Sequence, residues 1–187
     1  TIQSPVANPW MGGNMMRTLN YLDSTAVTFH RGVSVAWCSY SWVAQLRREL
    51  PDAVGGVVWM SVDNPAESPR IPIFCGTTKL PSAFDRCGNK VYGDDVAMWQ
   101  YRKANKLATV AWQSTKGMIN KAVLDEQARA LNGLSSLEQN VKASLAKDAK
   151  ADVSSLLNEY TYDVYLRTSN HWKQLEGKLW QRFGMGF

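Results

Sequence analysis

The fold class of this chain is decided by the stretch GGVVWMSVDNP, residues 55–65. After the two glycines, residues 57–62 are rich in β-branched and aromatic side chains, which pack well on a pleated sheet. The Asp-Asn-Pro that follows is a typical turn signal and ends the run. The sequence therefore predicts a strand over residues 57–62.

Segments on both sides of this run also favour strands. Residues 70–74 form a short extended piece limited by two prolines. Residues 26–37 show the clearest alternation in the chain, with Val, Phe and Trp side chains on one face and Thr, His and Ser on the other. Residues 40–50 fit either a strand face or a helical stripe. Three or four strands joined by short turns predict an antiparallel sheet.

After the strands, the apolar period changes to that of helices. We expect Asp94 or Asp95 to cap a first helix and a further helical run to cover residues 117–131. Ser135 and Glu138 have the spacing of a capping box, which predicts another helix start. Apolar stripes on these helices and on a last one comprise Val96, Trp99, Leu107, Val110, Leu137, Val141, Leu145, Trp172, Leu175, Leu179 and Phe183. Strands followed by helices predict an α+β fold.

The length and composition indicate how the chain is organised. With 187 residues, 45% of them hydrophobic, it can bury one substantial core. We expect residues 1–187 to be a single domain or the C-terminal portion of one. Residues 1–25 hold several prolines and glycines and read as a connector, residues 26–76 as the sheet strands, and residues 94–187 as a helical layer.

The net charge of +5 does not indicate a nucleic-acid partner. Lysines on the helical stretches alternate with aspartates and glutamates, which is the pattern of a solvated face rather than of a basic patch. No run of about 18 apolar residues is present, so we expect no membrane span. The opening Thr-Ile-Gln-Ser-Pro is not a signal peptide, and the compartment, cytoplasmic or exported, stays open.

Few side chains stand out as candidates for chemistry. Arg31 shares strand parity with the apolar side chains of residues 26–37, so it either meets a carboxylate, a carbonyl or a substrate, or extends along the sheet to water. His30 and His171 are far apart in sequence, with no Cys or Asp at ligand spacing. We therefore expect no metal and no cofactor.

The three cysteines form no close pair in the sequence. An internal nucleophilic cysteine needs a nearby base that lowers its pKa, and the sequence supplies none. We therefore expect Cys38 and Cys75 to be buried structural thiols. Thr1 could act as an N-terminal nucleophile with its own amine as base, but the prolines that soon follow it disfavour the central strand that this chemistry requires.

Several segments together resemble a known family. In order and spacing, they resemble bacterial cysteine dipeptidases of the N-terminal-nucleophile (Ntn) hydrolase class. The segments are HRGVSV (30–35), YSWVAQLR (40–47), LP (50–51), GGVVW (55–59), VDNP (62–65) and IPI (71–73). The runs at 97–99 and 158–172 look like the family's C-terminal helices. The resemblance covers most of the chain and is most specific between His30 and Ile73.

The resemblance implies the αββα sandwich of Ntn hydrolases, with residues 40–50 as a strand. It also implies hydrolysis of a dipeptide amide bond by a cysteine that propeptide removal places at an N-terminus, where the α-amine transfers the proton. This sequence has no cysteine at its start, so the nucleophile is expected on another chain or a missing segment. Arg31 matches the family's His-Arg-Thr pattern and is expected to support the active site, although Gly32 replaces the threonine.

Two kinds of function stay open. The first is the C-terminal part of a dipeptidase, with a dipeptide as substrate, an N-terminal chain of the same precursor as partner, and a possible homo-oligomer. It predicts a large exposed apolar surface on this chain by itself. The second is a non-catalytic small-ligand-binding or scaffold domain, in which Arg31 and an aromatic cleft hold a small acidic ligand.

Overall fold

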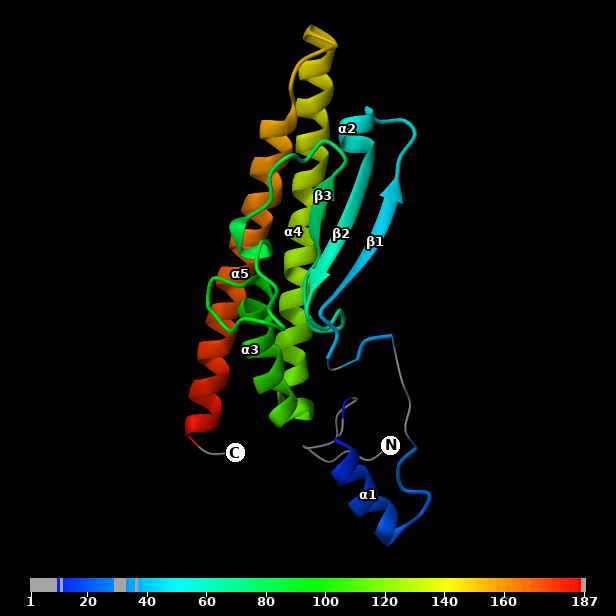
Figure 1. Cartoon of the computed structure of the whole chain (residues 1–187), viewed down its shortest axis with the longest axis vertical. Coiled ribbons are helices and arrows are strands. Elements are labelled where there is room, and N and C mark those ends of the chain that lie inside the picture. Colours follow the sequence, from blue (N-terminus) through cyan, green and yellow to red (C-terminus); the bar gives the residue numbers. More distant parts are fainter. Residues whose placement is uncertain (1–9, 11, 29–32, 36, 186–187) are drawn as a thin grey trace.

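The structure is a computed structural model that describes residues 10, 12–28, 33–35 and 37–185. A short helix, α1 (Gly13–Leu22), lies apart from the rest (Figure 1). Three strands follow, and three longer helices complete the described part, which is the α+β layout expected from the sequence. The second sheet of the αββα sandwich stays a prediction from the resemblance.

The strands form one antiparallel sheet in the order β1-β2-β3. They are β1 (Tyr40–Leu46), β2 (Gly56–Val62) and β3 (Ile71–Phe74), and the one-turn helix α2 (Asp52–Gly55) joins the first two. The pairing register sets Trp42 opposite Met60 and Val58 opposite Ile73. The strand expected over residues 57–62 is confirmed, and the ambiguous segment 40–50 forms a strand.

Helical elements follow the sheet along the chain. They are η1 (Ser82–Phe84), α3 (Ala97–Val110), α4 (Trp112–Lys147) and α5 (Ser154–Gly184). Of these, α4 and α5 cover one side of the sheet. Figure 1 shows α4 and α5 side by side and antiparallel, with the sheet lying along them and α3 packed near the lower half of α5. None of the described helices is both long and apolar enough to cross a membrane.

Two buried apolar clusters hold these layers together. The first joins the sheet to the upper part of the helix pair and contains Val57, Trp59, Phe74, Leu134, Leu137, Val141, Leu157 and Val164. The second lies between α3, α4 and α5 and contains Tyr101, Ala104, Ala108, Ile119, Tyr165, Trp172, Leu175 and Leu179. The apolar stripe predicted for the last helix is thus part of the core. Burying each such side chain contributes about 1.5–3 kcal/mol to the stability of the fold.

The strand expected over residues 26–37 is absent from its described part, which lies in turns and irregular backbone. Val33, placed by the alternation on the apolar face, is 96% exposed, and Trp37 is exposed as well. The alternation identified side chains that could share a face, but no described strand pairs with this segment. The first strand begins at Tyr40, later than the range 26–76 expected for the sheet.

Two predictions about helix starts are wrong. Asp94 and Asp95 do not cap α3, because Val96 occupies that position and the two carboxylates pair with Lys103 and Arg86. Ser135 and Glu138 do not begin a helix, because α4 continues through both residues. The Glu138 carboxylate instead pairs with Arg47 at the end of β1. Asp94, Asp95 and Glu138 are residue types that often occur at helix starts, but here each forms an ion pair with another part of the chain.

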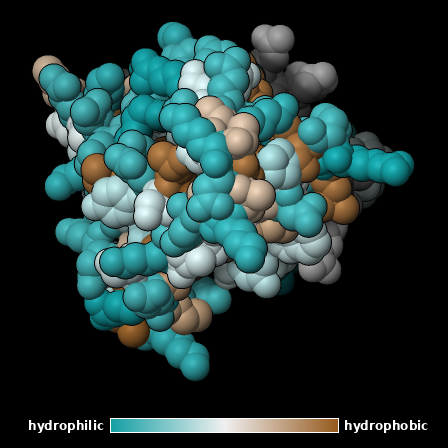
Figure 2. Space-filling model, turned by 90° about the horizontal axis from the view of Figure 1, so that it is seen from above, coloured by the Kyte–Doolittle hydropathy of each residue, from teal (hydrophilic) through white to brown (hydrophobic). Residues whose placement is uncertain are grey.

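The sheet face turned away from the helices is open among the described residues. Trp42 and Leu46 on β1 are 60% and 84% exposed, and Val58, Met60 and Ile73 beside them are half-buried. We call these five side chains the open sheet face. In contrast, Figure 2 looks down on one end of the molecule and shows hydrophilic side chains over most of it, with apolar atoms between them.

Candidate functional site

Polar side chains are buried together where β2 ends and the chain turns toward β3. Asp63, Asn64, Glu67 and Ser68 are no more than 1% exposed. Burial of such groups is costly unless each finds a hydrogen-bond partner. Two side chains of α3 supply several of these partners. We call the following residues the polar cluster: Asp63, Asn64, Glu67, Ser68, Arg102 and Asn105.

Asp63 is the residue on which the polar cluster is centred. Its φ of 69° lies in the left-handed region, which aspartate adopts more readily than most residues. One carboxylate oxygen accepts a hydrogen bond from Arg102 Nε at 2.5 Å, and the other accepts from Asn105 Nδ2 at 2.9 Å. The charge of Asp63 is therefore matched by one guanidinium in a buried setting.

Asn105 connects this turn to the helices. Its Nδ2 also donates to Ser68 Oγ at 2.9 Å, and its Oδ1 accepts from the buried Trp172 Nε1 at 2.8 Å. The Asn105 side chain is completely buried, so each of its bonds replaces one to water. The turn after β2 is thereby fixed to α3 and α5 together.

The polar cluster also holds the chain segment that follows residues 29–32. Ser34 Oγ donates to Asn64 Oδ1 and accepts from the Ala66 amide. Arg102 Nη2 donates to the Cys38 carbonyl at 2.6 Å, and the Asp63 amide donates to the Ser39 carbonyl at 2.8 Å. Ser34, Cys38 and Ser39 are therefore attached to the cluster.

Glu67 is the unusual member of the polar cluster. Burial, and next the negative charge of Asp63, raise the pKa of its carboxyl to about 8, although Lys106 and the hydrogen bond from Asn64 act in the opposite direction. Oε2 accepts from Asn64 Nδ2 at 2.9 Å, and Oε1 has no hydrogen-bond partner among the described residues. At neutral pH the side chain is predominantly the uncharged acid.

The sequence pattern of peptidase family C69 matches residues 17–125. This range is more than half of the 187 residues and contains the whole polar cluster. The chain belongs to peptidase family C69. C69 is a family of cysteine dipeptidases, so this family places the chain among hydrolases of the cysteine-peptidase type. No curated protein matches the chain.

The C69 match includes the segment in which we expect a supporting arginine. Arg31 and His30 lie outside the described residues, as does Thr1. The nearest described residues, Val33 and Ser34, follow directly and lead into the hydrogen bonds with the polar cluster. The role of Arg31 therefore stays a prediction, while the attachment of the segment next to it is a feature of the structure.

The cysteines of this C69 member are not arranged as nucleophiles among the described residues. All three are free, and Cys75 and Cys87 are exposed, so the expectation of a buried thiol is wrong for Cys75. The partly buried Cys38 donates from Sγ to the Tyr40 carbonyl at 3.2 Å. No described base bonds to any of the three thiols, and no described group of His, Cys, Asp and Glu side chains could hold a metal ion.

His171 belongs to a second buried charged group, between α4 and α5. Its Nδ1 lies 2.8 Å from Glu126 Oε1, and Arg167 Nε and Arg129 Nη1 pair with the same carboxylate at 2.7 and 3.2 Å. Burial tends to raise the pKa of Glu126, but the hydrogen bonds from Arg167 and His171 outweigh it and the pKa is lowered. We call these four residues the Glu126 cluster, and they fasten the two long helices to each other.

Sequence reasoning missed most of the polar cluster. Asp63 and Asn64 were interpreted only as the end of a strand, and Arg102 and Asn105 were not singled out. A usable signal was present, because Asn105 lies between Tyr101 and Ala108 on the buried side of α3. A polar residue on an apolar helix face requires a buried partner.

Proposed function

We propose that this chain provides the C-terminal part of a C69 dipeptidase whose nucleophilic cysteine lies on another chain or segment. The observation that carries this proposal is the attachment of Ser34 and Cys38, which follow Arg31 in the chain, to the buried polar cluster within the C69 match. A peptidase that positions a catalytic arginine needs a rigid support behind it. The described thiols lack a base, which supports a nucleophile elsewhere.

The proposed reaction is hydrolysis of the amide bond of a dipeptide. The thiolate of an N-terminal cysteine attacks the carbonyl carbon, and the cysteine's own α-amine carries the proton to the leaving amine. Water then cleaves the thioester and releases the second amino acid. Arg31 holds the substrate or the nucleophile in place, and the polar cluster fixes Ser34, Cys38 and Ser39, which follow Arg31 in the chain.

The open sheet face supports the proposed partner. Trp42 and Leu46 expose apolar area beside the half-buried Met60, and the outer edge of β1 pairs with no described strand. Apolar surface of this kind marks an interaction site. A layer from the N-terminal part of the same precursor would cover this face and give the αββα arrangement of Ntn hydrolases.

The test is to produce this chain together with the segment that bears the N-terminal cysteine and to assay dipeptide hydrolysis. We expect activity only when both parts are present, and Arg31→Ala to lower kcat/KM by at least about 100-fold, with Arg31→Lys intermediate. As a control, the triple replacement of Cys38, Cys75 and Cys87 by Ser should retain activity. Loss of hydrolysis in that triple variant would move the nucleophile into this chain and contradict the proposal.

A further inference from the structure

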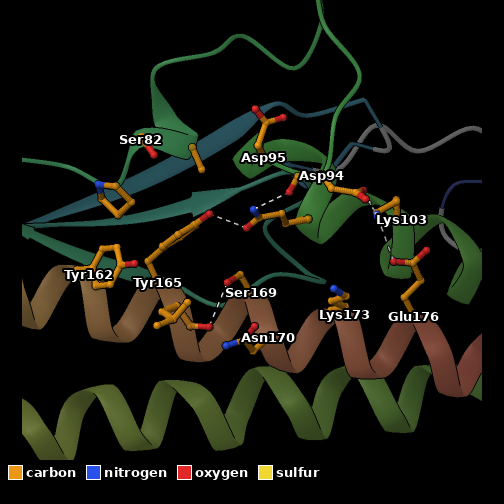
Figure 3. A pocket seen from close by; sticks show the side chains of 14 residues that line it. Ser82, Asp94, Asp95, Lys103, Tyr162, Tyr165, Ser169, Asn170, Lys173 and Glu176 are labelled. Carbon is orange, nitrogen blue, oxygen red and sulfur yellow. Dashed lines mark hydrogen bonds and ion pairs between the residues drawn. The ribbon is translucent and has the colours of Figure 1, made fainter.

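A pocket of about 340 Å³ lies along the outer side of α5, apart from the polar cluster. Its floor is formed by α5, and its walls come from the segment at residues 81–83, the turn at residues 94–95 and the first turns of α3. The volume is at the lower end of the range for small-molecule sites. Figure 3 shows its side chains pointing into one space from these separate elements.

One end of the pocket is largely apolar. Tyr162, Tyr165 and Leu166 of α5 line it together with Pro81 and Ala83. Tyr165 is fixed in place, because its hydroxyl donates to Gln100 Oε1 at 2.6 Å and its ring lies 5.4 Å from that of Phe84. This end offers aromatic and aliphatic area to a small apolar group.

The other end of the pocket carries charges of both signs. Lys103 Nζ pairs with Asp94 at 2.6 Å and with Glu176 at 3.4 Å. The hydrogen bond from Lys103 lowers the pKa of Asp94, and the same bond raises the pKa of Lys103, so both groups are ionised at neutral pH. Asp94 Oδ2 has no hydrogen bond from a described residue and can accept one more donor.

Two exposed polar groups on the floor of the pocket form no hydrogen bond with a described residue. They are the Lys173 ammonium, whose positive charge helps to lower the pKa of Asp94, and the Asn170 amide. These residues are three apart on α5, so their side chains emerge from the same helix face. Together they present N–H donors of the kind that hold a carboxylate.

The charges that line the pocket balance. Asp94, Asp95 and Glu176 are opposed by Lys103 and Lys173 inside it and by Arg86, which pairs with Asp95 from outside. A pocket without net charge favours a ligand that is itself neutral overall but carries both charges. A net anion or a net cation would leave one of these groups uncompensated.

The geometry points to a binding site for a free α-amino acid with an apolar side chain. Its carboxylate would be held by Lys173 and Asn170, its ammonium by Asp94, and its side chain against Tyr162 and Leu166. Amino acids are also the products of the proposed reaction, but binding here requires only this pocket, so the inference stands apart from the dipeptidase proposal.

The first experiment titrates the isotope-labelled chain with L-phenylalanine and follows amide chemical shifts. We expect saturable shifts confined to α5 over residues 162–176 and to the start of α3. Two analogues each lack one charge: phenylalaninamide has no carboxylate and N-acetylphenylalanine has no ammonium. Each should bind at least about tenfold more weakly, since each loses a charge-assisted hydrogen bond. Shifts that do not saturate, or equal binding of all three compounds, would overturn the inference.

Matched variants connect the two charges to their protein partners. Lys173→Gln should weaken L-phenylalanine about tenfold and leave phenylalaninamide unchanged, whereas Asp94→Asn should weaken L-phenylalanine and leave N-acetylphenylalanine unchanged. Lys178→Gln is the control, because Lys178 is exposed on α5 outside the pocket. An equal effect of Lys178→Gln and Lys173→Gln would show that only the general charge of the helix matters and would refute the site. These readouts are independent of hydrolysis.

Discussion

Glu67 and Glu126 are each 1% exposed, yet burial has opposite outcomes for them. Glu126 is contacted by Arg129, Arg167 and His171, and its pKa is lowered. Glu67 has an amide donor on one oxygen and no hydrogen bond from a described residue on the other, and its pKa is raised to about 8. The difference shows that burial does not decide the charge of a carboxyl group; the charged groups next to it do.

Asp63 explains why Glu67 is not compensated in the same way. The polar cluster contains one guanidinium, that of Arg102, whose Nε bonds to Asp63 while its Nη2 bonds to the Cys38 carbonyl. Asp63 also adds a negative charge that opposes the ionisation of Glu67. One buried cation thus serves one of two acids, and the other acid keeps its proton.

The largest effect is expected for Asp63→Asn. Asparagine accepts the left-handed backbone, so the variant removes the charge and leaves the turn geometry intact. Arg102, only 12% exposed at its side chain, would lose its ion-pair partner, at a cost of about 3–5 kcal/mol in the free energy of unfolding. Urea denaturation measures this loss. A cost below about 1 kcal/mol would show that the ion pair does not stabilise the turn.

A smaller loss is expected for Glu126→Gln, about 2–3 kcal/mol, because both arginines that pair with it, Arg129 and Arg167, reach water. The lowered pKa of Glu126 gives a pH signature. Its contribution is present above the unfolded value near 4.5 and is lost as the pH falls through the folded value. Stability curves of native and variant protein should therefore converge in acid. Parallel curves down to the acid limit would contradict an ionised Glu126.

A loss of about 1 kcal/mol is expected for His171→Gln, which removes one of the groups bonded to Glu126 but leaves both arginines. The midpoint of urea unfolding measures it at pH 7. A double-mutant cycle with Glu126→Gln separates the direct interaction from the packing of the ring. Strict additivity of the two single changes would show that the two side chains do not interact.

The smallest effect, at pH 4.5 or below, is expected for Glu67→Gln, within about 1 kcal/mol, because there a neutral amide replaces an acid that is neutral in the fold. The folded pKa of about 8 lies above the unfolded value of 4.5, so the contribution of the native Glu67 is full below about 4.5 and is lost progressively up to about 8. The variant should therefore gain stability relative to the native protein across this window. A constant difference from pH 4.5 to 8 would show that Glu67 is ionised in the fold.

The sequence was sufficient for elements that local pattern determines. The run at residues 57–62 forms β2, and the stripe of Trp172, Leu175 and Leu179 packs into the core because apolar spacing alone places it there. The strand expected over residues 26–37 failed because pairing depends on a neighbour that periodicity does not identify. The helix starts predicted at Asp94 and Ser135 were also wrong, because a capping role depends on neighbours that the local sequence does not identify.

The candidate site was less predictable, because its bonds join distant parts of the chain. Asp63 meets Arg102 and Asn105 at sequence separations of 39 and 42 residues. Residue type gave no means of pairing this aspartate with one arginine among many. The family resemblance drew attention to the same stretch, but only the packing of α3 under the turn brings the groups together.

The exposed edge of β1 has a consequence for handling this chain in solution. Its backbone N–H and C=O groups face outward beside Trp42 and Leu46, and such an edge serves as a template for strand addition by a second molecule. Concentrated samples should therefore form β-rich aggregates that grow from this strand. Replacing Val43, a half-exposed residue in the middle of β1, by lysine would place a charge on this edge and slow the aggregation of the protein.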